Sequence, residues 1–154
     1  MNAEQKELYY KKIQKLEDTF ENERDQIGCF LQENILAKLS DVKEIANIQV
    51  HCASQRHRLS DKISNLRTKI RKHNEKVGMD RKMMYFKYKT EYNVRLNDPE
   101  IHKHIDADLE PNTNFKIVLE NQIDYYRRTI EGIDKIGFAV KYLIESQRFL
   151  NGGY

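Results

Sequence analysis

Apolar side chains recur at intervals of three or four residues along most of the chain, which is the spacing of one face of an α-helix. Residues 45–70 are the clearest case, because their steps of three and four form a heptad seam with one stutter. Similar seams predict helices over 3–39 and 113–149. Seams this narrow on polar helices predict an all-α fold of long helices with coiled-coil-like packing. The seam residues are, in chain order, Leu8, Ile13, Leu16, Phe20, Ile27, Leu31, Ile35 and Leu39, then Ile45, Ile48, Cys52, Gln55, Leu59, Ile63, Leu66 and Ile70, then Phe115, Leu119, Ile123, Tyr126, Ile130, Ile133, Gly137, Val140 and Ile144.

Capping and turn residues mark where the predicted helices begin and end. Asp41 has an acidic residue three positions later, which is the spacing of a capping box, so the second helix begins near residue 42. Gly78 is the natural stop of that helix. Asp98 is a cap with Pro99 at the first helical position, and the helix that follows ends before Pro111. We therefore predict one all-helical domain over 1–154, with long helices over about 1–78, short helices over 79–111 and a C-terminal helix over 112–151.

Composition supports this fold class. Six glycines and two prolines make up about 5% of the 154 residues, where about 12% is average. So few turn residues exclude an all-β sandwich or barrel and make a Rossmann-like α/β fold unlikely to form.

Targeting and redox signals are mostly negative. The N-terminus is polar, so it does not resemble a secretory signal, and no uncharged run approaches the length of about 18–20 residues that a membrane span needs. Cys29 and Cys52 do not form a Cys-x-x-Cys pair. This usage suits a reducing cytoplasm, and both cysteines are interpreted as small core residues.

No motif predicts catalysis, a metal site or a cofactor. The glycines build no phosphate loop. His102 and His104 are two residues apart, which is poor spacing for two ligands on one helical face. Asp106, Asp108 and Glu110 resemble a carboxylate cluster, but they precede Pro111 and are interpreted as a solvated helix end. We therefore expect a protein that is not an enzyme.

Charge is concentrated in the middle of the chain. Residues 56–95 carry 13 basic and 4 acidic side chains, whereas residues 1–50 and 96–154 each carry 7 basic and 10 acidic ones. Four carboxylates in forty residues cannot neutralise this centre through pairs along the helix. The pattern therefore favours binding to a polyanion over a merely solvated helix face.

Aromatic residues interleave with this basic centre. Tyr85, Phe86, Tyr88 and Tyr92 alternate with lysines in one short stretch. Cations track phosphates and aromatic faces stack unpaired bases, so nucleic acid is expected, with single strands preferred. The alternative is that these aromatics belong to the core. The candidate DNA-binding residues are Arg58, Lys62, Arg67, Lys69, Arg71, Lys72, Lys76, Lys87 and Lys89.

The last helix is apolar on more than one side. Ile136, Phe138, Ala139, Tyr142 and Leu143 lie off its main seam, and a helix that is apolar on most sides must be covered on most sides. We interpret it as a self-association helix; the alternative is the buried terminal helix of a monomer. The candidate oligomerisation residues are Ile136, Gly137, Phe138, Val140, Leu143 and Ile144.

Short segments in a shared order resemble the UvsY family of recombination mediators from large tailed phages. Residues 66–70, Leu-Arg-Thr-Lys-Ile, resemble the start of the family's Leu-Lys-Ala-Arg-Leu-Asp-Tyr motif for single-stranded DNA. Residues 89–91, Lys-Thr-Glu, fall where the family has Lys-Ser-Glu, ahead of a segment like 94–101. Residues 136–141, Ile-Gly-Phe-Ala-Val-Lys, followed by Arg-Phe at 148–149, are similar to the family's ending.

This resemblance covers roughly residues 40–150 and implies a mediator of DNA recombination and repair. UvsY-like proteins form ring-like homo-oligomers through the C-terminal region, bind single-stranded DNA, contact the single-strand DNA-binding protein and help load a RecA-like recombinase. Arg67 and Lys69 would be the DNA contacts. Arg71 and Lys72 replace the Asp-Tyr of the motif, which is a departure from the family pattern.

The expected function is therefore a non-enzymatic mediator that binds single-stranded DNA without a cofactor, in the cytoplasm of the host cell if the chain comes from a phage. The alternatives are a structural coiled-coil or phage assembly protein without a DNA role, and an RNA-binding regulator.

Overall fold

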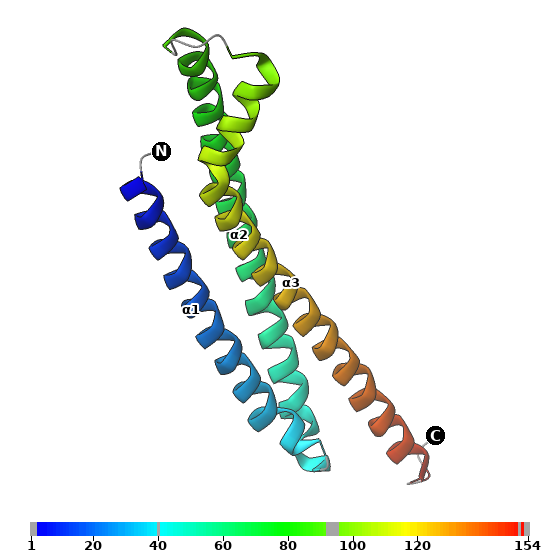
Figure 1. The fold of residues 1–154 in the computed structure, drawn as a ribbon. Helices are drawn as coiled ribbons and strands as arrows, with labels where there is room; N and C mark the ends of the chain where they lie inside the picture. The colour runs from blue at the N-terminus through cyan, green and yellow to red at the C-terminus, as the bar shows by residue number, and fades with distance from the viewer. Residues whose placement is uncertain (1–2, 40, 92–95, 151, 153–154) are drawn as a thin grey trace. The chain divides into compact units, whose positions relative to one another are not determined.

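Three long α-helices account for nearly all of the described chain. The computed structural model describes residues 3–39, 41–91, 96–150 and 152. The helices are α1 (Ala3–Asn34), α2 (Ile45–Thr90) and α3 (Asp98–Leu150), and two short 3-10 helices, η1 (Leu36–Lys38) and η2 (Val42–Glu44), lie between α1 and α2 (Figure 1). The described residues contain no strand, so the predicted all-α class is confirmed.

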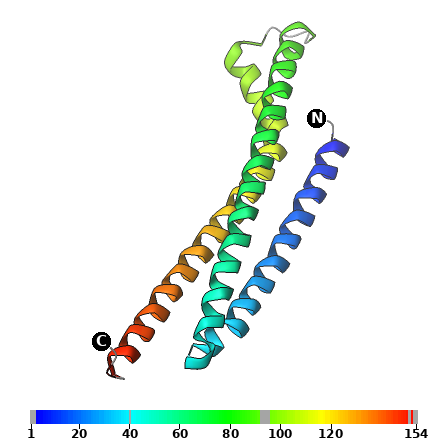
Figure 2. The same ribbon diagram turned by 180° about the vertical axis from the view of Figure 1, so that it is seen from behind.

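The chain forms two compact units, and each takes a segment from every long helix. The first unit comprises Met1–Thr19 and Asn65–Asn121, and the second comprises Phe20–Ser64 and Gln122–Tyr154. Figure 2 gives the reverse view of the same ribbon.

The predicted seams form the cores of the units. Nearly every seam residue of α2 and α3 named above is buried or half-buried, and so are those of α1 except Leu8, which is exposed. Apolar burial of this kind stabilises each helix more than its own propensity does. The prediction that both cysteines are core residues is right for Cys52 and wrong for Cys29, which is exposed on α1.

Polar contacts join α1 to α3 and α2 in the second unit. The Tyr126 hydroxyl donates to Glu23 Oε2 at 2.5 Å, and the same carboxylate is ion-paired with Lys62 on α2. Arg24 Nε donates to Gln122 Oε1 at 2.8 Å. These hydrogen bonds and this ion pair provide partners for polar and charged groups whose burial without a partner would cost free energy.

The sequence predicted that α2 ends at Gly78, but the helix continues past this residue. The core of the first unit explains the difference. Ile101, Ile105 and Leu109 of α3 form a buried cluster, and side chains on both sides of Gly78 pack against it. These side chains are Val77, Met84, Tyr85 and Tyr88. Burying one large apolar side chain is worth about 1.5–3 kcal/mol, whereas a glycine inside a helix costs about 1 kcal/mol. The helix therefore continues to Thr90.

Pro111 lies inside α3 rather than after a helix end. Proline has no N–H, so the carbonyl of Ala107, four residues earlier, loses its usual helical donor. Lys6 Nζ donates to that carbonyl at 3.1 Å and also lies 3.3 Å from Asp108. The proline ring is fully buried. A side chain from α1 thus compensates the defect, and the predicted short helices over 79–111 are instead parts of α2 and α3.

The start of α3 is a capping box one residue earlier than expected. Asn97 Oδ1 accepts a hydrogen bond from the Glu100 N–H, and Glu100 Oε2 accepts one from the Asn97 N–H, both at 3.0 Å. The N-cap is therefore Asn97 rather than Asp98. At the other predicted cap, Asp41 Oδ1 accepts from the Lys43 N–H at 2.9 Å.

Candidate nucleic-acid interface

The outward face of α2 in the first unit is strongly basic. Residues 65–90 contain nine lysines and arginines but only two acidic residues. Leu66, Ile70, His73 and Val77 are half-buried and point toward the unit's interior, so the residues between them face outward. The basic face comprises the exposed side chains of Arg67, Lys69, Arg71, Lys72, Lys76, Lys82 and Lys87.

Two of the nine cations are engaged by acids of α3. Arg81 is ion-paired with Asp106, and Lys89 lies 3.5 Å from Asp98. The hydrogen bond from Lys89 to the Tyr85 hydroxyl, followed by the charge of Asp98, raises the pKa of Lys89. Lys89 was a candidate DNA contact, but its ammonium group already has partners. The interpretation of Asp106 and Asp108 as a solvated helix end is wrong, because both lie inside α3.

The remaining cations of the basic face have no acidic partner among the described residues. Lys69 Nζ lies 5.4 Å from the ring centre of Phe115, a cation–π contact that leaves its charge exposed. Lys82 was missed by the sequence reasoning, although its charge belongs to the same basic centre. Because unpaired cations retain their full attraction for phosphates, this face is the best candidate interface for a polyanion.

Arg58 and Lys62, the two candidate DNA contacts in the second unit, differ in their exposure and in their partners. Arg58 is exposed. Lys62 is ion-paired with Glu23 and lies 5.9 Å from the ring centre of Tyr126, and burial lowers its pKa. Lys62 therefore holds helices together, and its assignment as a DNA contact is not supported by its position.

Most of the aromatic candidates already make contacts with other side chains of the protein. The Tyr85 hydroxyl donates to Asp98 at 3.0 Å and its ring stacks on His102. The Tyr88 hydroxyl donates to Asp108 at 3.0 Å and its ring stacks on His104. Phe86 makes an edge contact with the Tyr85 ring, with ring centres 6.3 Å apart, but 67% of its surface stays exposed. Tyr92 lies outside the described residues.

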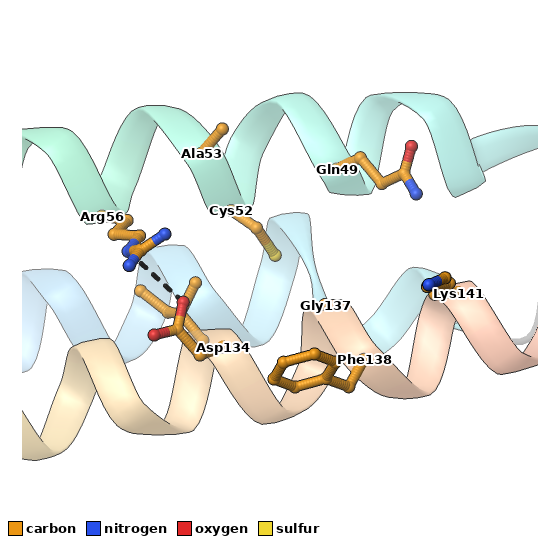
Figure 3. A pocket seen from close by; sticks show the side chains of 9 residues that line it. Gln49, Cys52, Ala53, Arg56, Asp134, Gly137, Phe138 and Lys141 are labelled. Atoms are coloured by element: carbon orange, nitrogen blue, oxygen red, sulfur yellow. Dashed lines mark ion pairs between the residues drawn. The ribbon is translucent and has the colours of Figure 1, made fainter.

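A groove between α2 and α3 in the second unit is a separate candidate site. Its volume is about 430 Å³. Figure 3 shows the ion pair at one end, where Arg56 Nε lies 3.4 Å from Asp134 Oδ1. Burial, and secondarily Asp134, raises the pKa of the Cys52 thiol, which disfavours a nucleophilic thiolate. The other lining residues are Gln49, Ala53, Ile133, Gly137, Phe138 and Lys141.

The predicted oligomerisation residues divide into exposed and buried ones. Val140 is only 1% exposed and belongs to the core of the second unit, so it is not part of a free surface. Ile136, Gly137 and Ile144 are half-buried. Phe138 and Leu143 are exposed. The helical spacing places Phe138 on one row with two further exposed aromatics, Tyr142, which the sequence placed off the main seam but not among the candidates, and Phe149, which the prediction omitted.

The described part of the chain contains neither a metal-binding cluster nor a membrane-spanning helix. Its histidines, cysteines and carboxylates do not converge in any group of three that could hold a metal ion. None of its helices has an apolar stretch long enough to cross a bilayer. No protein-family model, curated protein or solved structure matches the chain.

Proposed function

We propose that this chain is a mediator of DNA recombination that binds single-stranded DNA as a homo-oligomer. The observation that carries the proposal is the basic face of α2, whose seven exposed cations have no acidic partner among the described residues. The resemblance to UvsY-like mediators supports the finer part, which is assistance in loading a RecA-like recombinase onto DNA covered by single-strand DNA-binding protein.

Binding would proceed through phosphate contacts and counterion release. The length of α2 from Arg67 to Lys87 is 20 steps of 1.5 Å, or about 30 Å, so several phosphates of one strand can be contacted at once. Each contact is weak and sensitive to salt. In an oligomer, many such faces would bind one strand at the same time, so the overall affinity would rise steeply with the number of contacts.

Self-association would use the exposed aromatic row of α3. Phe138, Tyr142 and Phe149 are 64%, 66% and 77% exposed, which is unusual for side chains of this size on one row. A contiguous apolar patch of this kind is typical of a protein interface. The row belongs to the second unit and the basic face to the first, so self-association and DNA binding would use different residues.

The decisive experiment compares two double variants with the same loss of charge. Arg71→Gln with Lys72→Gln removes two cations from the basic face, whereas Lys12→Gln with Lys15→Gln removes two exposed cations from α1. Fluorescence anisotropy with labelled single-stranded DNA, duplex DNA and RNA is measured at several salt concentrations. The first variant should lose affinity and reduce the salt slope by about 1.4, since each single-strand phosphate contact contributes about 0.7. The α1 variant should match the wild type.

Other outcomes decide between the alternatives. Equal, small effects in both variants would mean that only net charge matters, and the basic face would not be a binding site. Tighter binding to RNA would favour the RNA-binding regulator, and no binding to any nucleic acid would favour a structural coiled-coil protein. The mediator role predicts faster recombinase filament formation on DNA precoated with single-strand DNA-binding protein.

The oligomer is tested separately by sedimentation. Phe138→Asp places a charge on the exposed row and should reduce the assembly to small species without unfolding the chain. Its affinity for a long strand should then fall much more than its affinity for a very short one. Leu8→Asp, at an exposed apolar residue of α1, is the matched control and should leave the assembly intact.

A further inference from the structure

Three large apolar side chains form an exposed row on α2 in the first unit. Met79, Met83 and Phe86 are 65%, 63% and 67% exposed. Their spacing of four and three residues places them on one side of the helix. Val77 and Met84 pack against the buried cluster of α3, so the row faces away from the unit's core. We call these three residues the apolar stripe.

The packing of the unit gives no reason for this stripe. Single exposed apolar residues are ordinary on protein surfaces, but a contiguous row marks a binding surface. Methionine adds flexibility and a polarisable sulfur that makes favourable contacts with aromatic rings. The surface is therefore suited to flat aromatic ligands.

Charge around the stripe selects the kind of ligand. Lys76 and Lys82 lie three residues before and after Met79, and Lys87 lies four residues after Met83. All three lysines are exposed and have no acidic partner in the described part of the chain. Two acidic residues also lie at helical spacing from the stripe, Glu75 four residues before Met79 and Asp80 three residues before Met83. Such surroundings favour a ligand that combines flat apolar faces with repeated negative charges.

We propose that Met79, Met83 and Phe86 form a stacking platform for the bases of a single strand whose phosphates lie along the flanking lysines. The inference rests on the proposed function, because the stripe continues the basic face along the same helix. An acidic amphipathic helix also combines apolar and negative groups. However, the basic face extends through Arg67, well beyond the stripe, which matches a long polyanion better than a short apolar contact.

This arrangement would give the protein its preference for single strands. In a duplex the base faces are already stacked on one another, so the stripe contributes nothing. In a single strand the faces are available, and bases stack favourably on exposed aromatic side chains whatever their sequence. The lysines bind both forms through phosphates, whereas the stripe distinguishes them.

The absence of tryptophan from the chain permits a direct test. Phe86→Trp introduces one tryptophan into the stripe, and Val50→Trp introduces one at an exposed position in the second unit that belongs to neither proposed binding surface. Oligothymidylate and a duplex are titrated separately while tryptophan emission is recorded. Stacking should quench the emission of Phe86→Trp with oligothymidylate but not with the duplex, and Val50→Trp should show no base-dependent quenching.

A second variant measures the contribution to affinity. Met79→Ser, Met83→Ser and Phe86→Ser combined should weaken single-strand binding by about 5-fold or more, the factor for at least 1 kcal/mol. Affinity for duplex should stay at the wild-type value. Because all three side chains are exposed, the triple variant should retain its helical circular dichroism spectrum.

The outcomes separate this inference from the proposed function. If Arg71→Gln with Lys72→Gln weakens binding but Phe86→Trp is not quenched, the basic face binds DNA and the stacking platform is refuted. If neither has an effect, the proposed function fails as well. Equal losses for single strands and duplex in the triple variant would also overturn the inference. Quenching by an acidic amphipathic peptide but not by oligothymidylate would assign the stripe to a protein partner.

Discussion

Replacing Gly78 by alanine should stabilise the protein, although the sequence suggests the opposite. In the structure Gly78 lies in the interior of α2 and is exposed. A Cβ added there would meet no atom within 4 Å, and Gly78 does not have a positive φ. Alanine in a helix interior is favoured over glycine by about 1 kcal/mol. Gly78→Ala should therefore raise the free energy of unfolding by about 1 kcal/mol, or the melting temperature by about 2–4 °C.

The measurement is urea and thermal unfolding followed by circular dichroism at 222 nm. Gly28→Ala is the matched control, because Gly28 is also an exposed glycine inside a long helix with open space around its Cα. Both variants should shift the transition upward by similar amounts. If residue 78 instead ended a helix in the left-handed conformation, alanine would destabilise the protein by about 1–2 kcal/mol. A downward shift in Gly78→Ala alone would thus refute the continuous helix.

Three further predictions follow from the first unit and the cysteines. Lys6→Met should lower the free energy of unfolding by about 0.5–1.5 kcal/mol, because it removes the hydrogen bond to the Ala107 carbonyl. In a Pro111→Ala background, where the restored N–H serves that carbonyl, urea denaturation should show a smaller loss. Burial opposes ionisation of Asp108, but hydrogen bonds from Tyr88 and Lys6 outweigh it and keep the pKa of this carboxyl below its ordinary value of 3.8. The stabilisation that ionised Asp108 gives the folded state is therefore present above pH 3.8 and is lost as pH falls through the lower folded-state pKa. Asp108→Asn should thus reduce the acid dependence of stability in unfolding curves measured from pH 2 to 6. A thiol reagent should label Cys29 at once in the folded protein, whereas Cys52 should react only after unfolding; equal rates would contradict this burial pattern.

The sequence was sufficient for the fold class and for most of the core. Helical periodicity depends only on which residues are apolar, and a buried row must repeat every three or four residues whatever its partner is. The seam from Ile45 to Ile63 is therefore buried as predicted. The excess of basic over acidic residues within residues 56–95 could also be determined from the sequence, because net charge is a property of composition.

Only the tertiary structure decided where the helices end. Gly78 and Pro111 are local signals worth about 1 and 3 kcal/mol against a helix. Packing around Ile101 and Ile105 outweighs the first, and Lys6 from a distant segment supplies the donor that the second removes. Neither compensation can be read from residues near the signal.

The tertiary structure also decided which members of the basic centre remain available. Arg81 and Lys89 are paired with Asp106 and Asp98 of α3, and Lys62 with a glutamate of α1. The sequence contains these charges but not their distances, and an ion pair forms only when folding brings its two side chains within about 4 Å. For the same physical reason, the exposed stripe of Met79, Met83 and Phe86 became visible only when the inward face of α2 was known.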